Sequence, residues 1–253
     1  MFFKRCAIAM LSLCALTAQA DTVTIRADLW YPFNGEPLAA KPGYMIELSQ
    51  KIFASAGYTV DYQLMPWSRA LSTVRKGDAD CVVGAYASDA AGFIFPRENW
   101  GVDSIDAYVK TGDKWRYTGA QSLLTRKVAT IQDYSYSPEI DTLIKQSPTA
   151  FDAAVGDDAI EKNIRKLING RVDTLLESHT VIASRLALPQ FENQLELAGH
   201  ITQPLPLYIA CSPANSARSK KLIEIIDTQT PLLHKSGEIE QIMKKYHLSD
   251  WNK

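Results

Sequence analysis

The chain has 253 residues, of which 27 are lysine or arginine, 28 are aspartate or glutamate, and 46% are hydrophobic. This length fits one or two domains with a sizeable core, and the formal net charge of −1 supplies no basic surface for nucleic acid. With 13 glycines and four cysteines, a collagen-like or disulfide-dense scaffold is excluded, and apolar residues spread along the whole length argue against disorder.

The first 20 residues have the layout of a cleavable secretory signal peptide. Lys4 and Arg5 precede a short apolar run, and Ala18-Gln19-Ala20 forms a small-x-small cleavage site. The apolar run has about 12 residues, whereas a membrane-spanning helix needs about 20. We therefore expect residues 1–20 to be removed and the mature chain to be exported to the periplasm.

Two cysteines, Cys81 and Cys211, follow the signal segment, and both lie in apolar runs typical of buried strands. An oxidising compartment would allow them to form a disulfide. The alternative is that both are buried thiols that pack as small hydrophobic side chains. Because no histidine is close to either in the sequence, we expect neither a catalytic cysteine nor a metal site there.

In the first part of the mature chain, short strand-like runs alternate with amphipathic helical segments. Gly57 and Gly77 are placed where helices would end. The β-α-β-α-β order predicts an α/β sheet with parallel neighbouring strands. The hydrophobic spacing predicts strands at 22–27, 59–64 and 80–85, and helices at 44–56 and 68–75.

The same alternation restarts in the second part, which predicts two lobes. The spacing predicts strands at 127–131, 151–155, 172–176 and 194–197, and helices at 138–145, 160–168 and 181–186. Residues 105–111 are expected to link the lobes outward, and 202–211 to form the return strand. Helices at 216–230, ended by Pro231, and at 238–246 would close the chain. One lobe would then comprise 21–108 and 205–253, and the other 109–204.

Common enzyme motifs are missing from the sequence. It has no G-x-S-x-G, no H-E-x-x-H, no P-loop and no G-x-G-x-x-G. None of the four histidines has a metal-ligand partner three or four residues away, so we expect no metal site and no cofactor. These patterns favour binding over catalysis.

Aromatic residues gather where the first three predicted strands end. Trp30, Tyr31 and Phe33 follow the first strand, Trp67 follows the second, and Tyr86 follows the third. In open α/β sheets, ligands bind in the crevice at the carboxyl ends of the strands, and aromatic faces can stack on a small ligand there. The alternative is that some of these side chains pack in the core.

Several segments, in this order and spacing, resemble bacterial periplasmic solute-binding proteins of the amino-acid-binding type, which are the family 3 substrate-binding proteins of ABC transporters. The resemblance covers essentially the whole mature chain. It implies a type II periplasmic-binding fold, a two-lobed clamshell whose lobes are mixed sheets flanked by helices, joined by two hinge strands, with the ligand in the cleft. The segments that carry it are 28–33, 43–48, 66–71, 77–80, 95–96, 170–173 and 207–210.

The resemblance also assigns roles to individual residues. It places Trp30 and Trp67 as the aromatic pair that sandwiches the ligand, and Glu177 and Ser178 at the strand end that binds the ligand's ammonium group. Backbone N–H groups at the start of the predicted helix after residue 137 would suit an anionic group. The other positions that the resemblance assigns to the cleft are Gly84, Ala85, Tyr86, Asp133, Tyr134 and Ser135, and the aromatic pattern adds Tyr31 and Phe33 as candidate ligand-binding residues.

One departure from the family pattern concerns the ligand. Amino-acid-binding members usually carry an arginine after the third strand that grips the ligand α-carboxylate, but residues 87–92 contain none. Either Arg69 or Arg97 substitutes for it, or the ligand lacks an α-carboxylate. The acidic residues Asp28, Asp89 and Glu177 make a cationic or amine-bearing ligand an option.

The resemblance implies a monomeric, non-enzymatic periplasmic protein that captures a small polar solute, an amino acid or an amine-like molecule, for the permease of an ABC-type importer. Two alternatives stay open. One is a sensor or signalling protein without its own transporter. The other is a dehydratase-like enzyme on the same scaffold, in which Glu177 would act as a general acid with a pKa raised by burial.

Overall fold

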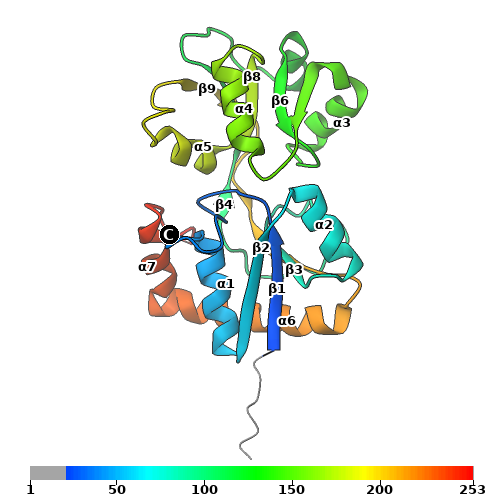
Figure 1. Ribbon diagram of the computed structural model, residues 1–253, viewed down its shortest axis with the longest axis vertical. Helices are drawn as coiled ribbons and strands as arrows, with labels where there is room; N and C mark the ends of the chain where they lie inside the picture. Colours follow the sequence, from blue (N-terminus) through cyan, green and yellow to red (C-terminus); the bar gives the residue numbers. More distant parts are fainter. Residues whose placement is uncertain (1–20, 253) are drawn as a thin grey trace, which may run out of the picture.

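The computed structural model describes residues 21–252, which form two α/β lobes placed end to end (Figure 1). The expected signal segment, 1–20, lies outside the described residues. The lower lobe in Figure 1 contains both ends of the described chain, and the upper lobe is built from its middle. Within the described range, no helix is long and apolar enough to cross a membrane.

The first lobe is built on a four-stranded sheet in the order β11-β3-β1-β2. Strand β1 runs parallel to β2 and β3, and β11 is antiparallel to β3, so the predicted parallel β-α-β-α-β unit is confirmed. The strands of this sheet are β1 (Asp21–Ala27), β2 (Tyr58–Leu64), β3 (Cys81–Ala85) and β11 (Tyr208–Cys211). Its helices are α1 (Tyr44–Ser55), α2 (Trp67–Lys76), α6 (Ser216–Ser236) and α7 (Glu238–Lys245).

Helix α2 shows how the sequence pattern sets a local structure that positions the cleft. Its apolar residues recur at helical spacing, so Trp67, Ala70, Leu71 and Val74 are buried together. Gly77 ends the helix in the left-handed conformation at φ 85°, which a side chain would disfavour. The buried stripe thus fixes the start of α2, where Trp67 lies, at the end of the sheet that faces the second lobe.

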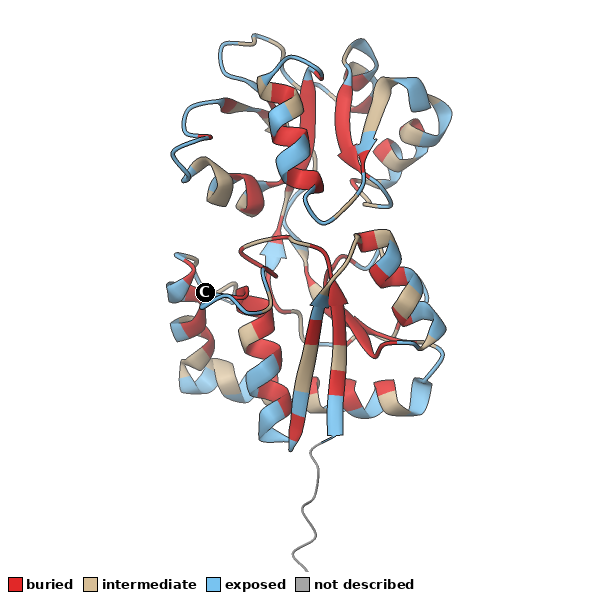
Figure 2. Cartoon of the chain, in the orientation of Figure 1, coloured by how far each residue is buried: buried red, intermediate tan, exposed pale blue. Residues whose placement is uncertain are grey.

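The second lobe has a five-stranded sheet in the order β7-β6-β8-β5-β9, in which β5 is antiparallel to both neighbours. Figure 2 shows buried residues following the sheets of both lobes. The strands are β5 (Ile105–Lys110), β6 (Val128–Ile131), β7 (Phe151–Ala154), β8 (Thr174–Ser178) and β9 (Leu195–His200). The helices are α3 (Pro138–Gln146), α4 (Ala159–Ile168) and α5 (His179–Leu186), with 3₁₀ turns η1 (Ala120–Thr125) and η2 (Pro148–Ala150).

The chain crosses between the lobes through a short antiparallel pair, β4 (Val102–Asp103) and β10 (Leu205–Pro206). The expectation that 105–111 forms the outward link was wrong, because residues 105–110 are a paired strand of the second sheet. The expected return strand is split at Leu207 into β10 and β11. The expected lobe boundary at 108–109 falls inside β5, and we propose instead that the boundary lies at the β4–β10 pair.

Helix α6 continues through Pro231, contrary to the prediction that the helix ends before it. Proline costs the helix one backbone hydrogen bond, but Leu222, Ile223 and Ile226 anchor α6 in the core. The helix stops at Gly237, which adopts the left-handed conformation at φ 78°. Tertiary burial therefore overrides the local stop signal.

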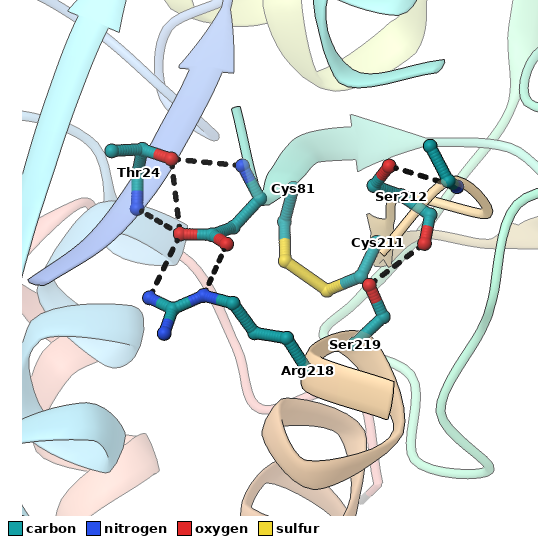
Figure 3. Close-up of a disulfide and its surroundings, with 8 residues drawn as sticks. Thr24, Cys81, Cys211, Ser212, Arg218 and Ser219 are labelled. Atoms are coloured by element: carbon teal, nitrogen blue, oxygen red, sulfur yellow. Dashed lines mark hydrogen bonds and ion pairs between the residues drawn. A yellow bond between two sulfur atoms is a disulfide. The ribbon is translucent and has the colours of Figure 1, made fainter. Parts of the chain in front are cut away.

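Cys81 and Cys211 form a disulfide (Figure 3) that joins β3 to β11 across a sequence separation of 130 residues. The two cysteines face each other in the antiparallel register of these strands. In the same region Arg218 pairs with Asp80, which also accepts hydrogen bonds from Thr24. The disulfide thus joins β11, the strand that returns from the second lobe, to β3 in the interior of the first sheet.

Candidate functional site

A small cavity lies between the two lobes, at the carboxyl ends of β1 and β3. Its volume is about 10 Å³, which is room for a single water molecule. The residues that line it come from both lobes: Asp28, Trp30, Trp67, Gly84, Tyr86, Asp89, Ile105, Tyr134 and Ser135. The site therefore lies where the sequence pattern predicts a crevice, and the lobes are closed on it.

Aromatic side chains form one wall of the cavity. Trp30 is stacked on Phe33 with ring centroids 4.3 Å apart, and it meets Tyr86 edge-on at 6.1 Å. Trp67 meets Tyr134 of the other lobe edge-on at 6.4 Å. Gly84 is needed behind this wall, since a Cβ there would lie 3.3 Å from the Trp30 ring. The tight packing holds the indole of Trp30 in one place.

Four hydrogen bonds join the lobes directly around the cavity. The Trp30 indole N–H donates to Glu177 Oε1 at 3.0 Å, and the Tyr134 hydroxyl donates to the Asp28 carboxylate. The backbone N–H of Ser135 donates to Asp89 Oδ1 at 3.0 Å. At the rim, the Ser184 hydroxyl donates to the carbonyl of Tyr31 at 3.1 Å. Groups of the protein itself thus bridge the cleft.

The carboxylate of Asp89 accepts hydrogen bonds from one backbone N–H group of each lobe. Its Oδ2 accepts from the N–H of Tyr86 at 3.2 Å, and its Oδ1 accepts from Ser135 as described above. Asp141 takes the next donors, the Ser135 hydroxyl at 2.7 Å and the Tyr136 N–H at 2.9 Å. Internal carboxylates therefore fill the donors just before α3, and the expectation for the N–H groups after residue 137 stays a prediction.

Glu177 is buried at the end of β8 with one oxygen satisfied and one not. Oε1 accepts from Trp30 and, at 2.8 Å, from the N–H of Ser178. Oε2 is buried and has no hydrogen-bond partner among the described residues, and the same holds for the hydroxyl of Tyr86. Burial raises the pKa of Glu177 from 4.5 to about 7, with the hydrogen bonds from Ser178 and Trp30 opposing the rise.

The two acids that line the cavity are also perturbed by burial. The pKa of Asp28 rises from 3.8 to about 6, mainly through loss of solvent, while the Tyr134 hydroxyl acts in the opposite direction. The pKa of Asp89 rises from 3.8 to about 7 for the same main reason. Three carboxyl groups therefore lie in one water-excluded region, where each charge is costly unless a cation offsets it.

The arginines expected to replace the missing carboxylate anchor lie elsewhere. Arg69 is on the exposed face of α2, opposite the buried stripe, so its expected place in the cleft is not supported. Arg97 pairs with Asp227 at 3.2 Å, and its side chain is 84% exposed. Arg185 in α5, which sequence reasoning missed, lies partly buried and acts electrostatically on Glu177, Glu161 and Tyr31. Its Nε is buried with no hydrogen-bond partner within the described chain.

The structure places the residues expected in the cleft in several different environments. Phe33 and Ala85 are buried in the core, Tyr31 is at the rim, and Asp133 is exposed. Ser178 caps the N-terminus of α5, where its hydroxyl accepts from Val181 and donates to the Asp103 carboxylate, while Glu177 meets the cavity through Trp30. The expected residues that do line the cavity are Trp30, Trp67, Gly84, Tyr86, Tyr134 and Ser135.

A separate polar cluster lies on β5 and its neighbours. The buried carboxylate of Asp106 contacts the Nδ1 atoms of His179 and His200, each at 2.8 Å. No group of three or more residues suited to a metal ion is present in residues 21–252. This cluster ties α5 and β9 to the centre of the sheet.

Comparison with known proteins places the chain by its fold. No family model matches it, and no curated protein matches it in sequence. Among solved structures, a protein of glutathione import via GshT and the cystine importer of Streptococcus mutans superposes with a TM-score of 0.76, 17% identity, and coverage of 92% of this chain and 98% of that chain.

Two further solved structures have the same architecture. A histidine kinase sensor domain with similarity to periplasmic binding proteins gives a TM-score of 0.75 at 19% identity, covering 90% of this chain and 98% of that chain. The amino acid ABC transporter substrate-binding protein AbpA of Streptococcus pneumoniae, bound to L-arginine, gives 0.69 at 20% identity, covering 89% and 93%. These likenesses confirm the expected two-lobed periplasmic-binding-protein fold.

Proposed function

We propose that this protein is a non-enzymatic periplasmic solute-binding protein that closes its lobes on a small polar solute and presents it to the permease of an ABC-type importer. The observation that carries the proposal is the interlobe cavity, which is walled by aromatic rings and bridged by hydrogen bonds from both lobes. Tyr86, whose buried hydroxyl has no hydrogen-bond partner among the described residues, lines this cavity, and Glu177, whose Oε2 is likewise unpaired, is joined to it through Trp30.

The hinge supports the same proposal. Only short strands, β4 and β10, pair where the chain crosses between the lobes, while each lobe has its own sheet. Such a construction allows the lobes to open and close as rigid bodies around a ligand. Because the closed cavity holds about one water molecule, entry of a larger solute requires opening.

A sensor role is the second candidate function. It is favoured by the likeness to a histidine kinase sensor domain, whose TM-score of 0.75 is close to that of the glutathione-import structure. Both roles use ligand-induced closure, so they share the cleft and differ in the partner that recognises the closed form.

The test is a thermal-shift screen of the mature protein, residues 21–253, after unfolding and refolding to remove any carried-over ligand. The library would contain amino acids, amines, small carboxylates and short peptides. A ligand present at about 100 times its dissociation constant should add about 2.7 kcal/mol of stability, which for a chain of this size raises Tm by roughly 5–10 °C.

Two tryptophan variants, one in the cavity and one outside it, would then locate the binding site. Trp67→Ala should weaken binding of the best hit at least about fivefold, because loss of one aromatic contact costs on the order of 1 kcal/mol or more. Trp115→Ala in the second lobe is the matched control, since Trp115 does not line the cavity. Equal affinity of both variants and the wild type would place the ligand outside this cleft.

A further inference from the structure

We propose that the cleft selects a cationic amine that carries no carboxylate, because the side chain of Asp89 already fills the position between the lobes that an anionic group would take. This inference rests on the proposed solute-binding function and names the chemical class of the solute. It is drawn from the donors and acceptors around the cavity and from the charges of the side chains that line it.

The backbone donors of Tyr86, Ser135 and Tyr136 are used by the protein itself. The backbone N–H groups of Tyr86 in one lobe and Ser135 in the other both point to the Asp89 carboxylate, at 3.2 and 3.0 Å. Asp141 occupies the following donors, the Ser135 hydroxyl and the Tyr136 N–H. A carboxylate that bridges two lobes in this way acts as a built-in anion, so a ligand carboxylate finds these donors already occupied.

The groups left without partners favour a hydrogen-bond donor with positive charge. Glu177 is 1% exposed, and its Oε2 has no partner among the described residues. Tyr86 is 6% exposed and lines the cavity, and its hydroxyl, which can donate to the nearby Asp103 carboxylate, can accept from a ligand. An ammonium group supplies up to three donors and one positive charge, which matches both requirements.

The charge of the site leads to the same class of ligand. The described residues lining this small cavity include Asp28 and Asp89 but no lysine, arginine or histidine, whereas the larger groove that shares Asp89 also includes Arg75 and Lys145. Glu177 adds a third carboxyl group through its bond to Trp30, and Arg185 is the cation that acts on it from α5. A zwitterionic ligand would bring a further carboxylate beside Asp89, and like charges in a buried site repel strongly.

The test uses three probes that share one carbon chain. L-Norvaline carries both charged groups, n-butylamine is the same molecule without the carboxylate, and pentanoate lacks the amine. Titration calorimetry on the stripped mature protein should show n-butylamine binding at least tenfold more tightly than norvaline, and no binding of pentanoate. Norvaline binding as tightly as n-butylamine would overturn the inference while leaving the solute-binding function in place.

Substitutions of Asp89 test the reason for the selectivity. Asp89→Ala frees the N–H groups of Tyr86 and Ser135 and removes one negative charge. The affinity for norvaline should therefore rise at least tenfold relative to the affinity for n-butylamine. Asp89→Asn keeps the shape and removes only the charge, so it should give a smaller gain. Asp157→Ala, an exposed aspartate before α4, is the matched control and should leave the ratio unchanged.

The remaining outcomes separate the two proposals. An unchanged norvaline to n-butylamine ratio in both Asp89 variants would show that this carboxylate does not exclude a ligand carboxylate, which overturns the inference. If n-butylamine fails to bind the wild type while an amino acid from the screen binds, the inference is again wrong and the proposed function stands. If no probe binds and no library member shifts Tm, both proposals fail together.

Discussion

The buried carboxyl of Glu177 makes the stability of the ligand-free protein depend on pH. Its pKa is about 7 in the closed cleft, compared with an ordinary value of 4.5. A tenfold change in an equilibrium corresponds to about 1.4 kcal/mol, so keeping this group ionised in the closed state costs about 3 kcal/mol. Because the pKa of Glu177 is higher in the folded protein than in the unfolded chain, its effect on the free energy of unfolding depends on pH. The free energy of unfolding is highest at low pH and falls as the pH rises from about 4.5 through about 7.

The ionisable groups that act on or are acted on by Glu177 come from several elements of both lobes. They are Asp28 after β1, Tyr86 after β3, Asp103 in β4, Tyr108 in β5, Tyr134 and Tyr136 before α3, and Arg185 in α5. Asp28 and Asp103 raise the pKa of Glu177, while the positive charge of Arg185 is attracted to it. Carboxyl groups whose pKa is lowered, such as Asp61 and Asp113, titrate below this pH window.

Glu177→Gln isolates the contribution of this one group, because glutamine cannot ionise and keeps an oxygen for Trp30 and Ser178. We expect the free energy of unfolding of this variant, relative to wild type, to rise by about 2 kcal/mol between pH 5 and pH 8, since part of the titration lies below pH 5. Urea denaturation at the two pH values measures it. Parallel pH profiles for variant and wild type would refute the assignment of a buried, costly charge to Glu177.

Two further predictions concern the first lobe. Replacing both Cys81 and Cys211 with alanine opens a loop of 130 residues, and the chain-entropy model gives a loss of about 5 kcal/mol in the free energy of unfolding; an unchanged urea midpoint compared with wild type would contradict it. Gly84→Ala places a Cβ 2.7 Å from Asn34 Oδ1 at φ +80°, so Tm should fall by an amount corresponding to about 1–3 kcal/mol. If its Tm and tryptophan emission match those of wild type, the close packing of Trp30 on this glycine is wrong.

The parts of the fold that depend on local periodicity could be predicted from the sequence. Helix α2 and the strand ends at Trp30 and Tyr86 follow from apolar spacing and from glycine stops, and these elements place the cleft. The hinge was harder to predict, because the sequence of β5 resembles that of any short apolar strand. Its place in the second sheet is set by pairing with β8 and β9, which are distant in the sequence. The predicted end of α6 before Pro231 was wrong for a related reason, since burial of the apolar side of α6 outweighs one lost hydrogen bond.

The position of the candidate site and the acidic residues near it were predicted from the sequence, but the hydrogen bonds that Asp89 makes there were not. The missing arginine after β3 was visible in the sequence, whereas the role of Asp89 was not. That role depends on Ser135, which is 46 residues away and reaches Asp89 only when the lobes close. Arg185 was missed because its neighbours in the sequence carry no signal of a site. Interlobe contacts of this kind are set by the hinge geometry rather than by local pattern.

Protons and a bound amine should compete for the same carboxyl groups. In the ligand-free closed cleft, Asp89 and Glu177 have pKa values of about 7, so a large fraction of them is protonated near neutral pH. An ammonium group at Glu177 Oε2 favours the ionised carboxylate and lowers its pKa, so binding releases protons. Near pH 7, the binding enthalpy of n-butylamine measured in two buffers of different ionisation enthalpy should therefore differ in proportion to the protons released.

The buffer dependence separates cation binding from simple closure. If a neutral ligand closed the cleft, the carboxyl groups would stay in the dry environment that raises their pKa, and protons would be taken up or unchanged. Proton release should be largest near pH 7. Below about pH 5 a weakly bound amine should release no protons, because the carboxyl groups then stay protonated. In Glu177→Gln the release should fall, and equal heats in both buffers for the wild type would show that no ammonium group meets these acids.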